Sequence, residues 1–190
     1  MTSTRPAISL LAVAAVLLPT AGCKDPGEEI PTRYNSARYS STPDGINSEI
    51  ATRGAEIVAF EIHQNPDEWR DLLDAVAQGS PEWLKAAVAL NDGTSGNATD
   101  ELTTAVRRAL ASEPENVLQL TARSWCIRCL CDAPDTRDPR YAAYRLAEAE
   151  LERRIAAVRT VEEKSLQVPR NTCLAELELG RGKLKRVFGR

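Results

Sequence analysis

The feature that most constrains the fold of this chain is a repeated helix start. Asn65-Pro66-Asp67-Glu68-Trp69 places a capping residue before a proline and puts a glutamate at the third helical position. Ser80-Pro81-Glu82-Trp83 repeats this opening, and Ser112-Glu113-Pro114-Glu115 is another capping pattern. Proline suits the first turn because its missing N–H has no intrahelical partner there, and the carboxylates complement the helix dipole. Each of these starts predicts a new, short helix.

Apolar residues follow the starts at helical spacing. Leu72 and Val76 follow the first, and Leu84, Ala87 and Leu90 follow the second. Only 5% of the residues are aromatic, which favours closely packed helices over a β-sandwich. Helices of about 10 to 14 residues separated by tight caps predict an all-α fold. We expect a compact bundle or an irregular, solenoid-like array of short helices.

Two further helical regions are predicted on either side of this series. Ile50, Ile57, Val58 and Ile62 have the spacing of one buried stripe after the tether. Near the other end, Asp138-Pro139 is predicted to open the longest helix, which extends to residue 159.

The last helix is predicted to start at Pro169-Arg170-Asn171 and to weaken at Gly180 and Gly182. A basic segment then ends the chain. We expect it to be a solvated tail or a set of cations near a helix C-terminus, rather than a contact with an anionic polymer or lipid. Its basic residues are Arg181, Lys183, Lys185, Arg186 and Arg190.

The first residues have the pattern of a secretory signal. Arg5 precedes a largely apolar run of 12 residues, Ala7–Leu18, and small residues then lead to Cys23. The run is too short to cross a bilayer as a helix, which needs about 20 residues. Ala21-Gly22-Cys23 resembles the lipobox of bacterial lipoproteins, although Thr20 stands where that motif usually has an aliphatic residue. The resemblance implies that Cys23 becomes the lipid-bearing N-terminus. Thr20 and Gly22 also suit an ordinary signal peptidase site, which would leave Cys23 free and the protein periplasmic.

The chain is therefore predicted to have three parts. Residues 1–22 are a signal peptide, residues 23–47 are a lipidated N-terminus with a flexible tether rich in proline and glycine, and residues 48–190 are a single helical domain. The formal net charge of −3 falls to −4 when the signal and its Arg5 are removed. A mildly acidic net charge does not favour binding to nucleic acid, because the phosphate backbone is bound mainly by Lys and Arg. We expect a protein of the cell envelope, anchored in the membrane through Cys23 and facing the periplasm or the exterior.

Cysteine chemistry has three interpretations. If Cys23 carries lipid, an even set remains for disulfides in an oxidising compartment. A bond from the last cysteine to one of the three clustered ones would join the last helices, and the other two could be paired or free. The four cysteines that remain are Cys126, Cys129, Cys131 and Cys173.

A zinc site of four thiolates is disfavoured by the compartment, so we expect no metal and no cofactor. His63, the sole histidine, is interpreted as a packed or surface residue rather than a ligand. Thiol redox chemistry at Cys126 and Cys129 is the third interpretation, with Arg128 lowering a thiol pKa. No βαβ pattern surrounds this CxxC, which disfavours a redox fold.

A mid-chain cysteine cluster followed by a helix and a late Cys173-Leu174 is similar to small all-helical exported bacterial proteins. That resemblance covers about the last third of the chain, and it implies a disulfide-linked helical domain without a particular chemistry. No P-loop, GxSxG or HExxH motif occurs. We therefore predict a non-enzymatic envelope module that binds another protein. The alternatives are an immunity protein that inhibits a periplasmic toxin and a thiol–disulfide oxidoreductase that uses Cys126 and Cys129.

Overall fold

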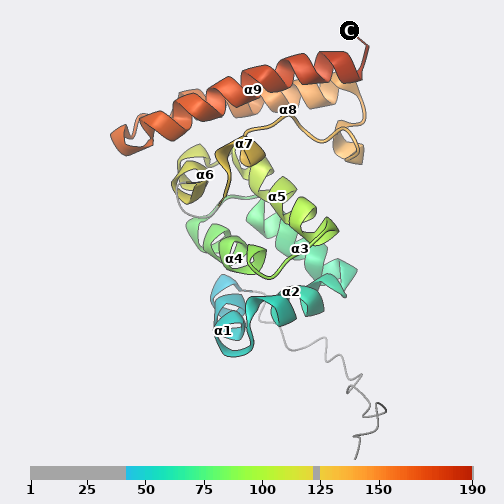
Figure 1. The fold of residues 1–190 in the computed structure, drawn as a ribbon, viewed down its shortest axis with the longest axis vertical. Coiled ribbons are helices and arrows are strands. Elements are labelled where there is room, and N and C mark those ends of the chain that lie inside the picture. The colour runs from blue at the N-terminus through green and yellow to red at the C-terminus, as the bar shows by residue number, and fades with distance from the viewer. Residues whose placement is uncertain (1–41, 122–124, 190) are drawn as a thin grey trace, which may run out of the picture. The chain divides into compact units, whose positions relative to one another are not determined.

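The computed structural model describes residues 42–121 and 125–189, and within these ranges it contains helices, turns and loops but no strand. The all-α prediction is confirmed (Figure 1). Cys23, the signal and most of the predicted tether lie outside the described residues. In chain order the elements are α1 (Pro43–Arg53), α2 (Ala55–His63), α3 (Pro66–Val76), α4 (Pro81–Asn91), α5 (Asn97–Ala109), α6 (Pro114–Thr121), α7 (Ile127–Leu130), the 3₁₀ turn η1 (Pro139–Tyr141), α8 (Tyr144–Arg159), the 3₁₀ turn η2 (Lys164–Leu166) and α9 (Gln167–Val187).

The repeated helix starts form as predicted. The backbone N–H of Glu68 donates to Asn65 Oδ1 at 3.5 Å at the start of α3. At the start of α4, the N–H of Trp83 donates to Ser80 Oγ at 3.4 Å. A proline follows the cap in both helices. Local capping chemistry therefore defines where these two helices begin.

The helical domain begins earlier than its predicted boundary at residue 48. The side chain of Thr42 caps α1 by accepting from the N–H of Gly45 at 3.3 Å, and Pro43 and Asp44 occupy the first turn. This is the same cap, proline and acid order as in α3. The prediction assigned these residues to the tether because proline and glycine are also common in flexible segments.

The predicted stripe from Ile50 to Ile62 is divided by a helix break. Gly54 has φ +89°, a backbone conformation that favours glycine, and it separates α1 from α2. Val58 and Ile62 are buried, but Ile57 is 49% exposed. The prediction that Ile57 is buried was wrong because the two helices do not continue one helical phase.

The C-terminal helices also differ from their predicted bounds. Pro139 opens only η1, and α8 begins after it at Tyr144. The longest described helix is α9, with 21 residues, and it continues through Gly180 and Gly182. Gly180 is a packing position, because a Cβ there would lie 3.1 Å from the backbone N of Ala133. The glycine thus permits a close approach of two segments within a continuous helix.

One cluster of buried apolar side chains connects the described helices. The pair α8 and α9 pack along each other, and α6 reaches from α4 to α8 and α9. Figure 1 shows α1 and α2 at one end of the described residues and α8 and α9 at the other. No helix in the described ranges is long and apolar enough to cross a membrane.

A disulfide joins Cys131, directly after α7, to Cys173 in α9. Both residues are fully buried, and they are 42 positions apart in sequence. The predicted disulfide in the C-terminal part is therefore present. The structure selects Cys131 as the partner of Cys173, a choice that sequence reasoning left open.

Loss of this bond should destabilise the domain strongly. We expect the double variant Cys131→Ala and Cys173→Ala to lower the free energy of unfolding by about 4 kcal/mol, because closing a loop of this length limits the unfolded chain. Urea denaturation of the oxidised protein measures the effect. The matched control, Cys126→Ser with Cys129→Ala, keeps a capping side chain at position 126, removes two exposed thiols and should change stability by less than about 0.5 kcal/mol. Equal stability of the two double variants would contradict a structural role for the bond.

Candidate functional site

The four clustered cysteines divide into two pairs of different character. Cys131 and Cys173 are bonded and buried, whereas Cys126 and Cys129 are exposed free thiols. All four belong to α7, its flanking residues and the helix that α7 packs against, α9. The bonded pair leaves two thiols of the four that a zinc site would need. Among the described residues, no group of three or more His, Cys, Asp or Glu side chains is placed to hold a metal ion.

Cys126 is the more readily ionised of the two free thiols. It caps α7, and the backbone N–H of Cys129 donates to its Sγ at 3.3 Å. A hydrogen bond from the Cys129 thiol and this backbone bond lower the pKa of Cys126. Partial burial, together with the same thiol–thiol hydrogen bond, raises the pKa of Cys129. The pair therefore has one thiol suited to nucleophilic attack and a second thiol beside it.

The surroundings of this pair involve two arginines. Arg107 on α5 donates its Nε–H to the carbonyl oxygen of Cys129 at 2.6 Å, which fastens the turn to α5. Arg128 pairs with Glu176 on α9, with 3.2 Å between Nε and Oε1. Arg128 lowers the pKa of Cys126 less than the hydrogen bonds do. The sequence prediction thus included the effect of Arg128 on the Cys126 pKa but missed the larger effect of the hydrogen bonds from Cys129.

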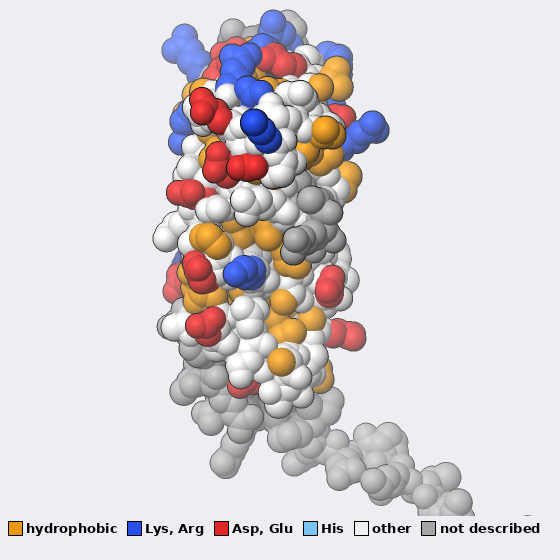
Figure 2. All heavy atoms as spheres, turned by 90° about the vertical axis from the view of Figure 1, so that its left-hand side faces the viewer, with side chains coloured by type: hydrophobic (Ala, Val, Ile, Leu, Met, Phe, Trp, Pro, Cys, Tyr) orange, Lys and Arg blue, Asp and Glu red, His pale blue; other side chains and the backbone are white. Residues whose placement is uncertain are grey.

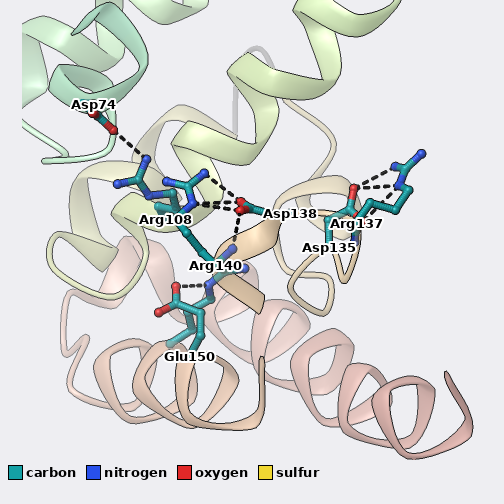
Figure 3. Close-up of polar contacts among 8 residues, drawn as sticks. Asp74, Arg108, Asp135, Arg137, Asp138, Arg140 and Glu150 are labelled. Carbon is teal, nitrogen blue, oxygen red and sulfur yellow. Dashed lines mark hydrogen bonds and ion pairs between the residues drawn. The ribbon is translucent and has the colours of Figure 1, made fainter. Parts of the chain in front are cut away.

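An alternating group of charges lies where the segment between α7 and α8 comes close to α3 and α5. Asp74 on α3 accepts from Arg108 on α5 at 3.0 Å, and Asp138 accepts from Arg140 at 2.7 Å. Figure 3 shows the Asp138 carboxylate close to both arginines. Burial opposes ionisation of Asp138, but the hydrogen bonds from Arg140 outweigh it and lower its pKa. Because each of these two guanidinium groups already pairs with a carboxylate, the group offers no free site for an anion.

A second candidate site is a groove of about 710 Å³ beside α2. It lies between α2 and residues 92–98, and we call it the α2 groove. Ile57 and Phe60, 49% and 62% exposed, are its large apolar side chains. Three carboxylates and no Lys or Arg line it; the carboxylates are Glu56, Glu61 and Asp92. Sequence reasoning missed this groove because it placed Ile57 in the core.

Close backbone packing shapes the α2 groove. A Cβ on Gly93 would lie 2.2 Å from the carbonyl carbon of Ala55, so only glycine lets this loop rest on the start of α2. His63 lines the groove and packs edge-on against Trp69 with ring centroids 5.2 Å apart. Its Nε2 is 3.8 Å from Glu101, which also accepts from the indole N–H of Trp69. His63 is therefore a packed histidine at the groove wall.

Charge is unevenly distributed between the two halves of the domain. Residues 43–121 hold 14 Asp or Glu and 5 Lys or Arg, a formal charge of −9. Residues 125–189 hold 10 Asp or Glu and 13 Lys or Arg, a formal charge of +3. On the face shown in Figure 2, Lys and Arg side chains concentrate at the height of α8 and α9, among acidic ones, while hydrophobic side chains gather lower down. The net charge of the whole chain conceals this asymmetry.

A scan against protein-family models and searches of curated proteins and of solved structures found no match to this chain. Fold and chemistry define it as an all-α domain linked by a buried disulfide. Its two candidate sites are the exposed thiol pair Cys126 and Cys129 and the acidic α2 groove.

The thiol pair generates a direct prediction about reactivity. After mild reduction of the exposed thiols, iodoacetamide should alkylate Cys126 faster than Cys129, and the pH midpoint for Cys126 should lie below the ordinary thiol value of about 8.5. Peptide mass mapping at successive times measures both rates. Cys129→Ala removes the donating thiol and should raise the midpoint for Cys126. Equal alkylation rates at Cys126 and Cys129 would contradict the hydrogen-bonded arrangement of the two thiols.

Proposed function

We propose that the protein is a non-enzymatic interaction module of the bacterial cell envelope, anchored through lipid on Cys23, and that it binds a protein partner through the α2 groove. The observation that carries this proposal is the exposure of Ile57 and Phe60 side by side in an acid-lined groove. The export signal and the segment rich in proline and glycine before residue 42 support the anchored part of the proposal.

Burial energetics favour a partner at this place. Covering one large apolar side chain contributes about 1.5–3 kcal/mol, so Ile57 and Phe60 together can supply much of the affinity for a ligand. Glu56 and Asp92 form no ion pair with another described residue. A partner with an apolar side chain flanked by Lys or Arg would match both properties of the groove. An immunity protein that inhibits a basic toxin is a narrower form of the same proposal.

A second candidate function, thiol–disulfide exchange, is favoured by the lowered pKa of Cys126. The Cys126 thiolate would attack a disulfide of the substrate, forming a mixed disulfide and releasing one substrate sulfur, which takes up a proton. Cys129 would then displace the second substrate sulfur. The products are a Cys126–Cys129 disulfide and a reduced substrate, so the substrate disulfide is the oxidant. Loss of exchange in Cys126→Ser, with groove binding unchanged, would distinguish this function from the first.

Lipidation of Cys23 can be tested in cells of the protein's own host. Cys23→Ser should move the protein from the membrane fraction to the soluble periplasmic fraction, because the acyl chains supply the membrane affinity. Cell fractionation and intact mass of the purified protein measure the change. The matched control is Cys126→Ser, which should stay in the membrane fraction with an unchanged lipid adduct. An unmodified Cys23 in the wild-type protein would contradict anchoring.

Partner binding can be tested with site-specific crosslinking in the intact envelope. A photoreactive residue at Ile57 should capture a defined protein, whereas the same residue at Leu146, which is 53% exposed on α8, should not. Phe60→Ser should then weaken binding of the captured protein at least about tenfold, or 1.4 kcal/mol, because a buried aromatic anchor is lost. Leu146→Ser is the matched control. Equal capture from both positions would overturn the assignment of the groove.

A further inference from the structure

The C-terminal end of α9 carries Lys and Arg side chains, which are absent from the lining of the α2 groove. Arg181 and Lys183 are engaged by carboxylates, with 2.6 Å to Glu152 and 2.7 Å to Asp132. The next two cations, Lys185 and Arg186, are exposed, and neither forms an ion pair with a described residue. Val187, which follows them, is 63% exposed. A helix C-terminus accounts for cations in the last turn, but it does not account for an exposed valine beside them.

This group is complementary to the groove in both polarity and charge. The groove offers two exposed apolar side chains, Ile57 and Phe60. It also offers two carboxylates, Glu56 and Asp92, that form no ion pair with a described residue, whereas its third carboxylate, Glu61, pairs with Arg53. The α9 end offers one exposed apolar side chain, Val187, next in sequence to two cations that form no ion pair with a described residue. Opposite charges around an apolar contact add affinity and fix its orientation. Residues 43–121 are negatively charged overall and residues 125–189 are positively charged, so the long-range attraction between two molecules also favours this contact.

The two surfaces cannot meet within one chain. Helix α2 packs against α1, α3 and α4, whereas α9 packs against α6, α7, α8 and η2. Figure 1 shows α2 and α9 at opposite ends of the described residues. A contact between them therefore requires two molecules. Because different patches meet, the contact is heterologous, and it extends into chains or closes into a ring.

We propose that the α2 groove receives the basic end of α9 from a second copy, so that the protein associates head to tail. This proposal rests on the groove identified under the proposed function and names its occupant. A single helix end buries less than a standard interface of about 800 Å² per partner, so the association is weak in solution. Anchoring of all copies in one membrane would raise their effective concentration. Salt weakens the association because the attracting charges are exposed.

Charge reversal on each side tests the contact. The test protein is the mature full-length chain with Cys23→Ser, studied by sedimentation velocity over a concentration series at low and high salt. Glu56→Lys with Asp92→Lys reverses the groove, and Lys185→Glu with Arg186→Glu reverses the α9 end. Each reversal alone should raise the dissociation constant of self-association at least about tenfold. All four changed residues are exposed, so the variants should keep the helical content of the parent, which circular dichroism checks.

Combining the two reversals in one chain is the decisive measurement. The combined variant restores opposite charges across the contact and should associate again. If the single reversals weakened association only by disturbing the fold, the combined variant should associate even more weakly. Leu146→Ser should associate like the parent. A parent that stays monomeric at every concentration would overturn the proposal, as would association that survives both single reversals. A monomeric parent whose Ile57 position still captures another envelope protein would overturn only the second copy as occupant and leave the proposed function standing.

Discussion

The bond between Cys131 and Cys173 is the constraint on which the arrangement of the two halves depends. It joins α7, which packs against α5 and α6, to α9, which packs along α8. Other contacts gather around the same place: Gly180 lets α9 approach Ala133, and Lys183 pairs with Asp132. The covalent link thus stands among close packing and charge pairing. Together they hold the basic helix α9 against α7 and the segment that follows it.

Burial gives neighbouring cysteines opposite roles. Cys131 lies in the core and is bonded, while Cys126, which caps α7, and Cys129, within this four-residue helix, are exposed to solvent. A buried disulfide is shielded from exchange, whereas an exposed thiol with a lowered pKa is available for it. One short segment therefore carries both a structural link and a pair of accessible thiols, and solvent access separates them.

The two ends of the domain also differ in how their charged side chains are paired. On α8 and α9 most cations have carboxylate partners, including the fully buried Arg154, whose Nε–H donates to Glu150 at 2.8 Å. Such pairs neutralise one another's charge and leave little charge for a ligand. The α2 groove is different, because Glu56 and Asp92 have no basic neighbour in its lining. The groove therefore combines carboxylates that have no ion pair among the described residues with exposed apolar side chains, two properties that a binding partner can satisfy.

Local signals in the sequence determined the fold class and several helix starts, because a cap such as Asn65 or Ser80 acts within its own first turn. They also indicated that Cys173 would be bonded within the cysteine cluster. Only the tertiary structure selected Cys131, because pairing depends on which cysteine the packing of α7 on α9 brings close. The same holds for the groove. Periodicity placed Ile57 in a buried stripe, but the break at Gly54 turned α2 and left that side chain exposed. Spacing reports which residues share a helix face, and only packing between helices decides which face is covered.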